Sequence, residues 1–226
     1  MKIDLIYFKM RALAEAPQLL MHYLNIDYNY VMSWDYYNKE WSELKSLIPF
    51  KQLPMIVVDG EHQICQSIAI MSYVESISGT ALTDPILIGK ASSILQSAQE
   101  LFMPLNPTIN FAVGDDFKKK CEGMMPSLLS RFEDLEKILL STNEKFFIDD
   151  TPRACDFATF HHLDLSKKID EKILENFPRL AQFINDISSI NSIKSYLEKR
   201  PELIDVSIKP KLVIDGIPHP TGTQQT

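Results

Sequence analysis

The sequence predicts an α/β unit followed by an all-helical unit, and two observations carry this prediction. Within residues 1–79, short β-rich runs alternate with segments of helical periodicity in the order β-α-β-α-β-β-α, which is typical of one sheet with helices on its faces. From residue 84 to 200, helical periodicity continues without a convincing strand. We therefore expect a domain boundary near 79–84, an all-α C-terminal helical domain over 84–205, and a mobile C-terminal extension over 206–226.

The first half of the α/β unit is built from short segments. Residues 3–8 are β-rich and predict a strand, apolar residues at helical spacing predict a helix over 12–24, and residues 28–32 predict a second strand. We interpret the polar and aromatic stretch 34–41 as an irregular loop with a short helix.

A hairpin and a helix complete this unit. The strand that begins at Leu53-Pro54 ends in Asp59-Gly60, a pair typical of a two-residue hairpin turn, and residues 63–65 supply the return strand. Ser67 is a good cap for the helix that follows, which ends at Ser78-Gly79-Thr80. In the second unit the periodicity predicts four helices, over 85–105, 116–140, 155–169 and 179–200.

Composition and charge argue against several classes of protein. A hydrophobic content of 45% with 10% aromatic residues is ample for a packed core, and the longest apolar runs are far shorter than the roughly 18 residues of a membrane span. A charge within Met1–Asp4 does not suit a signal peptide, so we expect a cytoplasmic protein without a membrane partner. The net charge of −7, without a stripe of Lys and Arg, argues against a nucleic-acid partner. The three cysteines lack CxxC or metal-ligand spacing, which predicts neither a disulfide framework nor a metal site.

One combination of motifs is specific. The segment Pro49-Phe-Lys-Gln-Leu-Pro-Met-Ile-Val-Val-Asp-Gly is followed by Gln66-Ser-Ile-Ala-Ile-Met-Ser-Tyr, and Tyr7-Phe8-Lys9-Met10-Arg11 and Ala14-Glu15 precede both. Together they resemble the cytosolic glutathione transferases, most closely the sigma class, over residues 2–200. The resemblance implies an N-terminal thioredoxin-like domain that binds glutathione, a helical domain that forms the second-substrate pocket, and a homodimer.

The chemistry of glutathione gives two of these motifs a physical reason. Glutathione is an anionic tripeptide, so its site needs an extended edge to pair with and donors for two carboxylates. A cis Leu53-Pro54 bond would turn the Leu53 N–H and C=O outward to bond the cysteinyl unit, whereas the alternative is an ordinary trans turn. Ser67 at a helix N-terminus offers a hydroxyl, free N–H groups and the positive end of the helix dipole to the γ-glutamyl carboxylate, and its alternative is a plain helix cap.

The resemblance assigns roles to further residues that hold the ligand. It implies that Gln66 bonds the same γ-glutamyl group, that Trp41 and Lys45 reach the glycyl carboxylate, and that Gln52 helps to hold the peptide. Without the resemblance, Lys45 would be interpreted as a solvated surface lysine.

Tyr7 is the catalytic candidate. A phenol hydroxyl at the end of the first strand can donate a hydrogen bond to the glutathione sulfur, which stabilises the thiolate and lowers a thiol pKa that is about 8.5 in the free state. The thiolate is the attacking species. The alternative is a half-buried strand aromatic.

The second substrate is expected over the sulfur, between the loop after the first strand and the helical domain. Phe8, Met10 and Leu13 would line its pocket on one side and Met103 on the other, with His162 as a further candidate. Aromatic and Met residues in such patterns are alternatively core residues, and a His beside another His on a helix is alternatively a surface or satisfied core residue.

Three positions depart from the family pattern. Leu13 stands where sigma-class enzymes carry an arginine that supports the thiolate, and Arg11 is a candidate to compensate. Gln96 stands where the family usually has an aspartate that reaches the γ-glutamyl ammonium bound in the partner subunit. The helix cap Ser/Thr-x-x-Asp reads Arg153-Ala-Cys-Asp156, so we expect a shifted cap, with Thr151 as the candidate hydroxyl.

These residues predict conjugation of glutathione to small apolar electrophiles, a detoxification reaction in which thiolate formation and proximity supply the rate. Sigma-like enzymes also isomerise prostaglandin-type peroxides with glutathione, and the sequence does not choose among conjugation, isomerisation and peroxide reduction. The alternative from another class is a non-catalytic binding or structural protein on the same fold, such as a crystallin-like protein. Retention of Tyr7, Lys45 and Ser67 favours the enzyme.

Overall fold

Four strands form a mixed sheet in the order β2-β1-β3-β4. β1 (Ile3–Tyr7) runs parallel to β2 (Asn29–Met32) and antiparallel to β3 (Met55–Val58), which pairs in turn with β4 (His62–Cys65). Every residue of β1 and β3 is buried, as expected of the two central strands. The computed structural model describes residues 1–200, 213–214 and 217–218.

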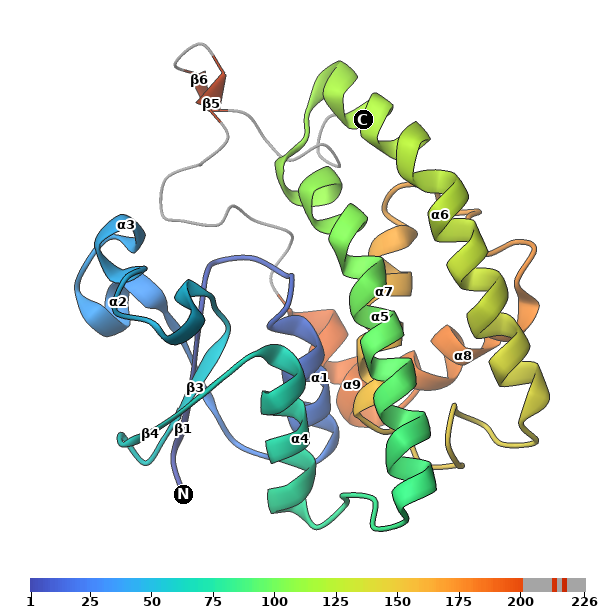
Figure 1. The fold of residues 1–226 in the computed structure, drawn as a ribbon, viewed down its shortest axis with the longest axis horizontal. Coiled ribbons are helices and arrows are strands. Elements are labelled where there is room, and N and C mark those ends of the chain that lie inside the picture. Colours follow the sequence, from blue (N-terminus) through green and yellow to red (C-terminus); the bar gives the residue numbers. More distant parts are fainter. Residues whose placement is uncertain (201–212, 215–216, 219–226) are drawn as a thin grey trace.

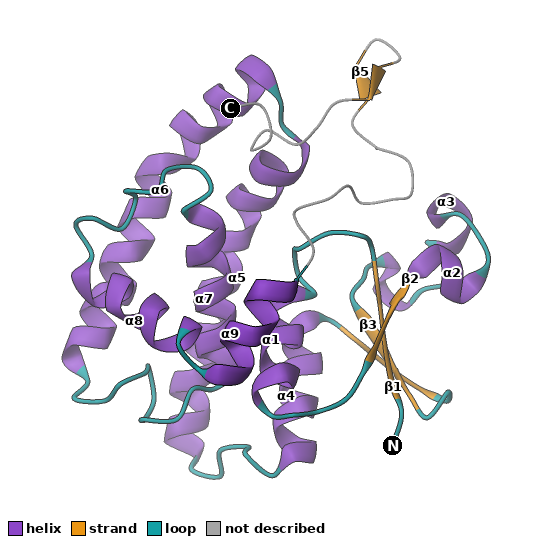
Figure 2. Ribbon diagram, turned by 180° about the vertical axis from the view of Figure 1, so that it is seen from behind, coloured by secondary structure: helices purple, strands orange, loops and turns teal. Residues whose placement is uncertain are grey.

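Two helices cover the face of the sheet that meets the helical part of the chain. α1 (Glu15–Tyr23) and α4 (Ser67–Ser78) pack against each other between the strands and α7 (Ala154–Ser166), as Figure 1 shows. The connection from β2 to β3 carries three short elements that lie away from the helical domain (Figure 2): α2 (Ser33–Tyr37), α3 (Trp41–Leu44) and the 3₁₀ turn η1 (Pro49–Lys51).

The helical part is organised around α7. The long helices α5 (Pro85–Phe111) and α6 (Gly114–Ser141) run alongside each other (Figure 1), and α7 packs against α5 and α1. Every residue of α7 except Asp164 is buried, which identifies it as the central helix of this domain. α8 (Pro178–Ser188) and α9 (Asn191–Lys199) complete the domain, and α9 contacts α1.

The connection between the two parts ends in a helix cap. Residues 79–84 lead from α4 to α5, and Gly79, in the left-handed region at φ 74°, ends α4 as the sequence predicts. The Asp84 carboxylate accepts the N–H of Ile86 at 2.7 Å and that of Leu87 at 3.3 Å. Pro85 occupies the first turn of α5, where its missing N–H costs no hydrogen bond.

This architecture confirms the predicted fold class, an N-terminal thioredoxin-like α/β domain followed by an all-α domain. Among the helices in the described part of the chain, none has the length and hydropathy that a membrane span requires. The prediction for the extension 206–226 falls largely outside the described residues. Within it, Val213–Ile214 (β5) pairs antiparallel with Ile217–Pro218 (β6).

Three local predictions need correction. The hairpin after β3 has a loop of three residues and not two, because Val58 pairs with His62. The segment 179–200 forms two helices and not one, because Ile190 between them is extended, with φ −65° and ψ 126°. α5 also continues beyond its predicted end at 105 to Phe111.

The start of α7 is capped by a residue that the sequence did not suggest. The Asp156 carboxylate accepts the N–H of Arg153 at 2.8 Å and that of Phe147 at 3.0 Å, which is the expected aspartate half of the cap. A second acceptor comes from Glu75 of α4, whose Oε1 accepts the N–H of Ala154, the first residue of the helix, at 2.8 Å. Thr151 was therefore the wrong candidate, because the partner comes from the other domain.

Candidate active site

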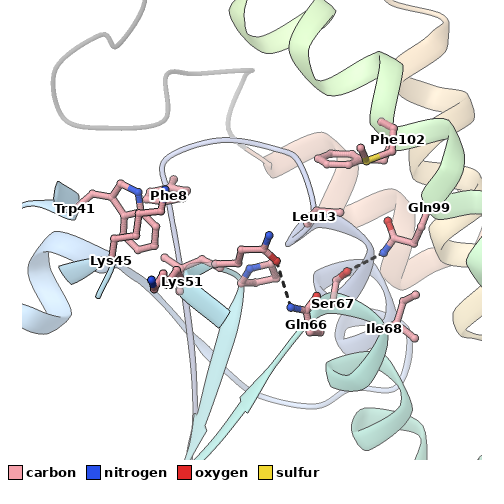
Figure 3. Close-up of a pocket in the computed structure, with 14 residues that line it drawn as sticks. Phe8, Leu13, Trp41, Lys45, Lys51, Gln66, Ser67, Ile68, Gln99 and Phe102 are labelled. Carbon is pink, nitrogen blue, oxygen red and sulfur yellow. Dashed lines mark hydrogen bonds between the residues drawn. The ribbon is translucent and has the colours of Figure 1, made fainter. Parts of the chain in front are cut away.

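A cavity of about 570 Å³ opens between the α/β domain and α5 (Figure 3). Most predicted site residues line it, together with four residues that were not predicted. The predicted residues in its lining are Phe8, Leu13, Trp41, Lys45, Gln52, Leu53, Pro54, Gln66, Ser67 and Met103. The residues that were not predicted are Lys51, Ile68, Gln99 and Phe102.

One end of the cavity is aromatic and basic. Trp41, the first residue of α3, meets the Phe8 ring edge-on with ring centroids 4.9 Å apart. The backbone around Phe8 is anchored because the Tyr30 hydroxyl donates to the Phe8 carbonyl at 2.6 Å. Lys45, just beyond α3, and Lys51 in the turn before β3 bring two ammonium groups to this end. This end is therefore suited to a carboxylate.

The floor of the cavity follows the start of β3. The Leu53-Pro54 peptide bond is cis, as predicted, and both residues line the cavity. The Gln66 side-chain amide donates to Gln52 Oε1 at 3.3 Å across the floor. This bond leaves the Gln52 amide hydrogens and the Gln66 carbonyl oxygen available to a peptide ligand.

The other end of the cavity is the N-terminus of α4. Ser67 is the first helical residue and not the cap; the cap position belongs to Gln66, which has φ 74°. The Ser67 side chain is 5% exposed, and its Oγ accepts a hydrogen bond of 2.7 Å from Gln99 Nε2 on α5 (Figure 3). The first N–H groups of the helix and its dipole favour an anion at this end.

Tyr7 lies behind the cavity wall. Its side chain is 4% exposed and belongs to the core, and it does not appear among the residues that line the cavity. Its hydroxyl oxygen lies near the backbone N–H of Leu13, a lining residue. Burial raises the pKa of Tyr7 well above its usual value, and the Leu13 N–H lowers it in part. The hydroxyl therefore stays protonated, as a hydrogen-bond donor, at neutral pH.

The apolar side of the cavity differs from the predicted set. Leu13 and Met103 line it together with Phe102, and Met103 is 72% exposed. Met10 is 6% exposed and His162 is 2% exposed, and both lie outside the lining because they are core residues. His162 packs behind Phe102, with ring centroids 5.7 Å apart, and burial lowers its pKa to about 3.

Two of the departures from the family pattern can be placed in the structure. Arg11 does not line the cavity. Burial lowers its pKa, and the charges of Arg200, Glu15 and Asp164 act on it. Compensation by Arg11 for Leu13 stays a prediction.

The second departure concerns α5. Gln96 is exposed and outside the cavity, whereas Gln99 is half-buried and lines it. Gln99, Phe102 and Met103 follow one another at helical spacing and so share one face of α5. Because the sequence already predicted Met103 at the cavity, this spacing was the signal that could have identified Gln99 and Phe102.

The comparisons with known proteins agree with this geometry. Residues 3–76 match the family described as glutathione S-transferase, N-terminal domain, and residues 106–200 match glutathione S-transferase, C-terminal domain. Glutathione S-transferase 4 of Caenorhabditis elegans is 30% identical over 206 residues, which cover 88% of this chain and 97% of the relative. The chain therefore belongs to the glutathione S-transferase family, which confirms the predicted family and the prediction of a glutathione transferase enzyme.

Solved structures show the same fold. The glutathione S-transferase from Ascaris lumbricoides has a TM-score of 0.78 at 23% identity, over 89% of this chain and 98% of that chain. A monomeric glutathione S-transferase from the hookworm Necator americanus has a TM-score of 0.77 at 23% identity, with the same coverage.

Proposed function

We propose that this protein binds glutathione along the cavity and joins the glutathione sulfur to small apolar electrophiles, with the Tyr7 hydroxyl as the group that stabilises the thiolate. The observation that carries the proposal is the order of side chains along one continuous cavity (Figure 3). Two lysines lie at one end, a cis-proline edge and two amides form the floor, and a helix N-terminus lies at the other end. This order matches an anionic tripeptide with a carboxylate at each end.

The glutathione would lie with its glycyl carboxylate at Lys45 and its γ-glutamyl head at Ser67. Its cysteinyl unit would then pass along Leu53, whose backbone faces the ligand in the same way that a neighbouring strand would. The Gln52 amide hydrogens and the Gln66 carbonyl oxygen are available to the peptide groups between the two ends.

The sulfur would lie beside Leu13, where the Tyr7 hydroxyl meets the cavity wall. The Leu13 N–H near the Tyr7 oxygen can only donate, so it does not compete for the phenol proton, which is available to the sulfur. A hydrogen bond to the thiolate lowers the pKa of the bound thiol, and each unit corresponds to about 1.4 kcal/mol in favour of the attacking species.

The electrophile would lie against Leu13, Phe102 and Met103, whereas Phe8 lies at the basic end beside Trp41 (Figure 3). These residues offer an apolar surface without a charged group, which favours small hydrophobic compounds over polar ones. Proximity of the electrophile to a preformed thiolate then supplies most of the rate.

The proposal also includes the sigma class and a homodimeric assembly. The Tyr7 and Gln66-Ser67 motifs support the sigma class, while the relatives include nematode and Mu-class enzymes. We propose a cytoplasmic homodimer with a role in detoxification. Gel filtration would then give twice the chain mass of 25.9 kDa, and elution at the chain mass itself would refute the dimer.

The experiment that tests the function is conjugation of a chromogenic aryl halide, together with retention on a glutathione resin. Wild-type protein is expected to bind the resin, elute with free glutathione and turn over the halide. A protein that is inert and passes through the resin would overturn the proposal.

A further inference from the structure

The α4 end of the cavity holds an anion-binding arrangement that contains no cation. Among the residues that line the cavity in the described part of the chain, the charged side chains are Lys45 and Lys51, and both lie at the opposite end (Figure 3). A carboxylate at Ser67 would therefore depend on neutral donors, namely the Ser67 hydroxyl and the first N–H groups of α4.

Binding of a carboxylate at this end then depends on the direction in which the Ser67 hydroxyl donates its proton. A serine hydroxyl has one proton and two acceptor positions, so it can either donate toward the cavity or donate elsewhere. Gln99 Nε2 donates to Ser67 Oγ at 2.7 Å, so the hydroxyl accepts on the side of α5. Its single proton remains for a group in the cavity.

We propose that Gln99 is a positioning residue that orients the Ser67 hydroxyl as a donor to the carboxylate of the γ-glutamyl head. This inference rests on the proposed glutathione site. Gln99 comes from α5 and Ser67 from α4, so the contact joins the helical domain to the α/β domain at the ligand itself. A ligand without a carboxylate at this end gains nothing from the arrangement, so Gln99 also contributes to specificity for γ-glutamyl peptides.

Three variants separate this role from a merely structural one. The Gln99→Leu variant removes the donor and leaves the hydroxyl free to rotate, so we expect the Kd for glutathione to rise roughly 3- to 10-fold. The Gln99→Glu variant places an acceptor opposite Ser67, so the hydroxyl turns away from the ligand, and a negative charge is added nearby. We expect a loss on the order of 10- to 100-fold for that variant. Gln182→Leu, which removes an exposed amide on α8 outside the cavity, is the matched control and keeps the wild-type Kd.

Isothermal titration calorimetry of each variant with glutathione gives the Kd. Thermal melts show that each variant is folded, and steady-state kinetics give its kcat and its KM for glutathione. We expect the loss in Gln99→Leu to appear in the KM for glutathione and not in kcat, because Ser67 lies at the end of the ligand away from the sulfur. In a Ser67→Ala background, Gln99→Leu should change the Kd by less than roughly twofold, because its target is gone.

The outcomes discriminate between the two proposals. If wild-type protein binds glutathione and the Gln99→Glu variant binds it with equal affinity, the role of Gln99 is overturned and the proposed function stands. An undiminished effect of Gln99→Leu in the Ser67→Ala background would do the same, since Gln99 would then act through another group. Absence of glutathione binding by wild-type protein would overturn the proposed function, and this inference with it.

Discussion

Glu75 on α4 accepts the backbone N–H of Ala154 at 2.8 Å, so the first turn of the central helix α7 is capped by a carboxylate from the other domain. Arg153 strengthens the same junction, because its guanidinium donates to the Thr80 carbonyl at 2.8 Å and pairs with Asp149. Burial raises the pKa of Glu75, and the Ala154 N–H and the Arg153 charge lower it in part. The two domains are thus joined by hydrogen bonds as well as by apolar packing.

This cap predicts a loss of stability in the Glu75→Ala variant. Loss of a helix cap typically costs about 1–2 kcal/mol, and here it also leaves a partly buried N–H without an acceptor. The Glu75→Gln variant keeps an oxygen in the same place and should lose less. Thermal melting of the three proteins compares them, and equal melting temperatures for wild type and Glu75→Ala would contradict the role of the cap.

The basic end of the cavity predicts an effect of salt on glutathione affinity. Lys45→Met should raise the KM for glutathione roughly 3- to 10-fold at low ionic strength, because it removes one of two cations near the glycyl carboxylate. The exposed Lys45 ammonium is screened, so the difference from wild type should shrink at high salt. Lys39→Met is the control, because Lys39 is exposed but outside the cavity. An equal effect of both substitutions would indicate a general charge effect.

Buried histidines predict sensitivity to acid. Burial lowers the pKa of His162 to about 3, while the unfolded value is about 6.5. Between these values the unfolded chain binds a proton that the folded chain does not, so His162 contributes stability above about pH 6.5 that is lost as the pH falls. The loss is about 2 kcal/mol between pH 7 and pH 5. Burial also lowers the pKa of His161, whose contribution has the same sign.

Urea unfolding at pH 7 and pH 5 tests this prediction. The His162→Leu variant should lose less stability than wild type between the two pH values, whatever its absolute stability. His62→Gln is the control, because His62 is exposed on β4 and should leave the pH dependence unchanged. Parallel losses in wild type and His162→Leu would show that acid sensitivity arises elsewhere.

Local motifs predicted the half of the site that is contiguous in sequence. Leu53-Pro54 directly precede β3 and Gln66-Ser67 directly follow β4, so the β3–β4 hairpin between them fixes their relative geometry. Gln99 was missed because its role depends on how α5 packs against α4, which periodicity does not specify. Met10 was misplaced because an apolar pattern does not distinguish a core side chain from a cavity wall. His162 was misplaced because its burial depends on how α7 packs between α5 and α1.

The break at Ile190 and the cap from Glu75 were missed for related reasons. The run Ser188-Ser189-Ile190-Asn191-Ser192 has the Ser and Asn residues typical of a loop, but it has no Gly or Pro, and the helical periodicity on both sides was interpreted as continuous. A cap supplied by a distant helix leaves no local pattern, so a search near Arg153 was bound to select the wrong residue.

The central claim is that the Tyr7 hydroxyl stabilises the thiolate of bound glutathione, and the ionisation of that thiol tests it most directly. The ultraviolet absorbance of the thiolate, followed against pH in the complexes of wild type and Tyr7→Phe, gives the pKa of the bound thiol. Tyr23→Phe is the control, because Tyr23 packs against Phe157 away from the cavity. We expect a wild-type value below the roughly 8.5 of a free thiol, and a value about 1–2 units higher in Tyr7→Phe. Identical values in the two proteins would contradict the claim.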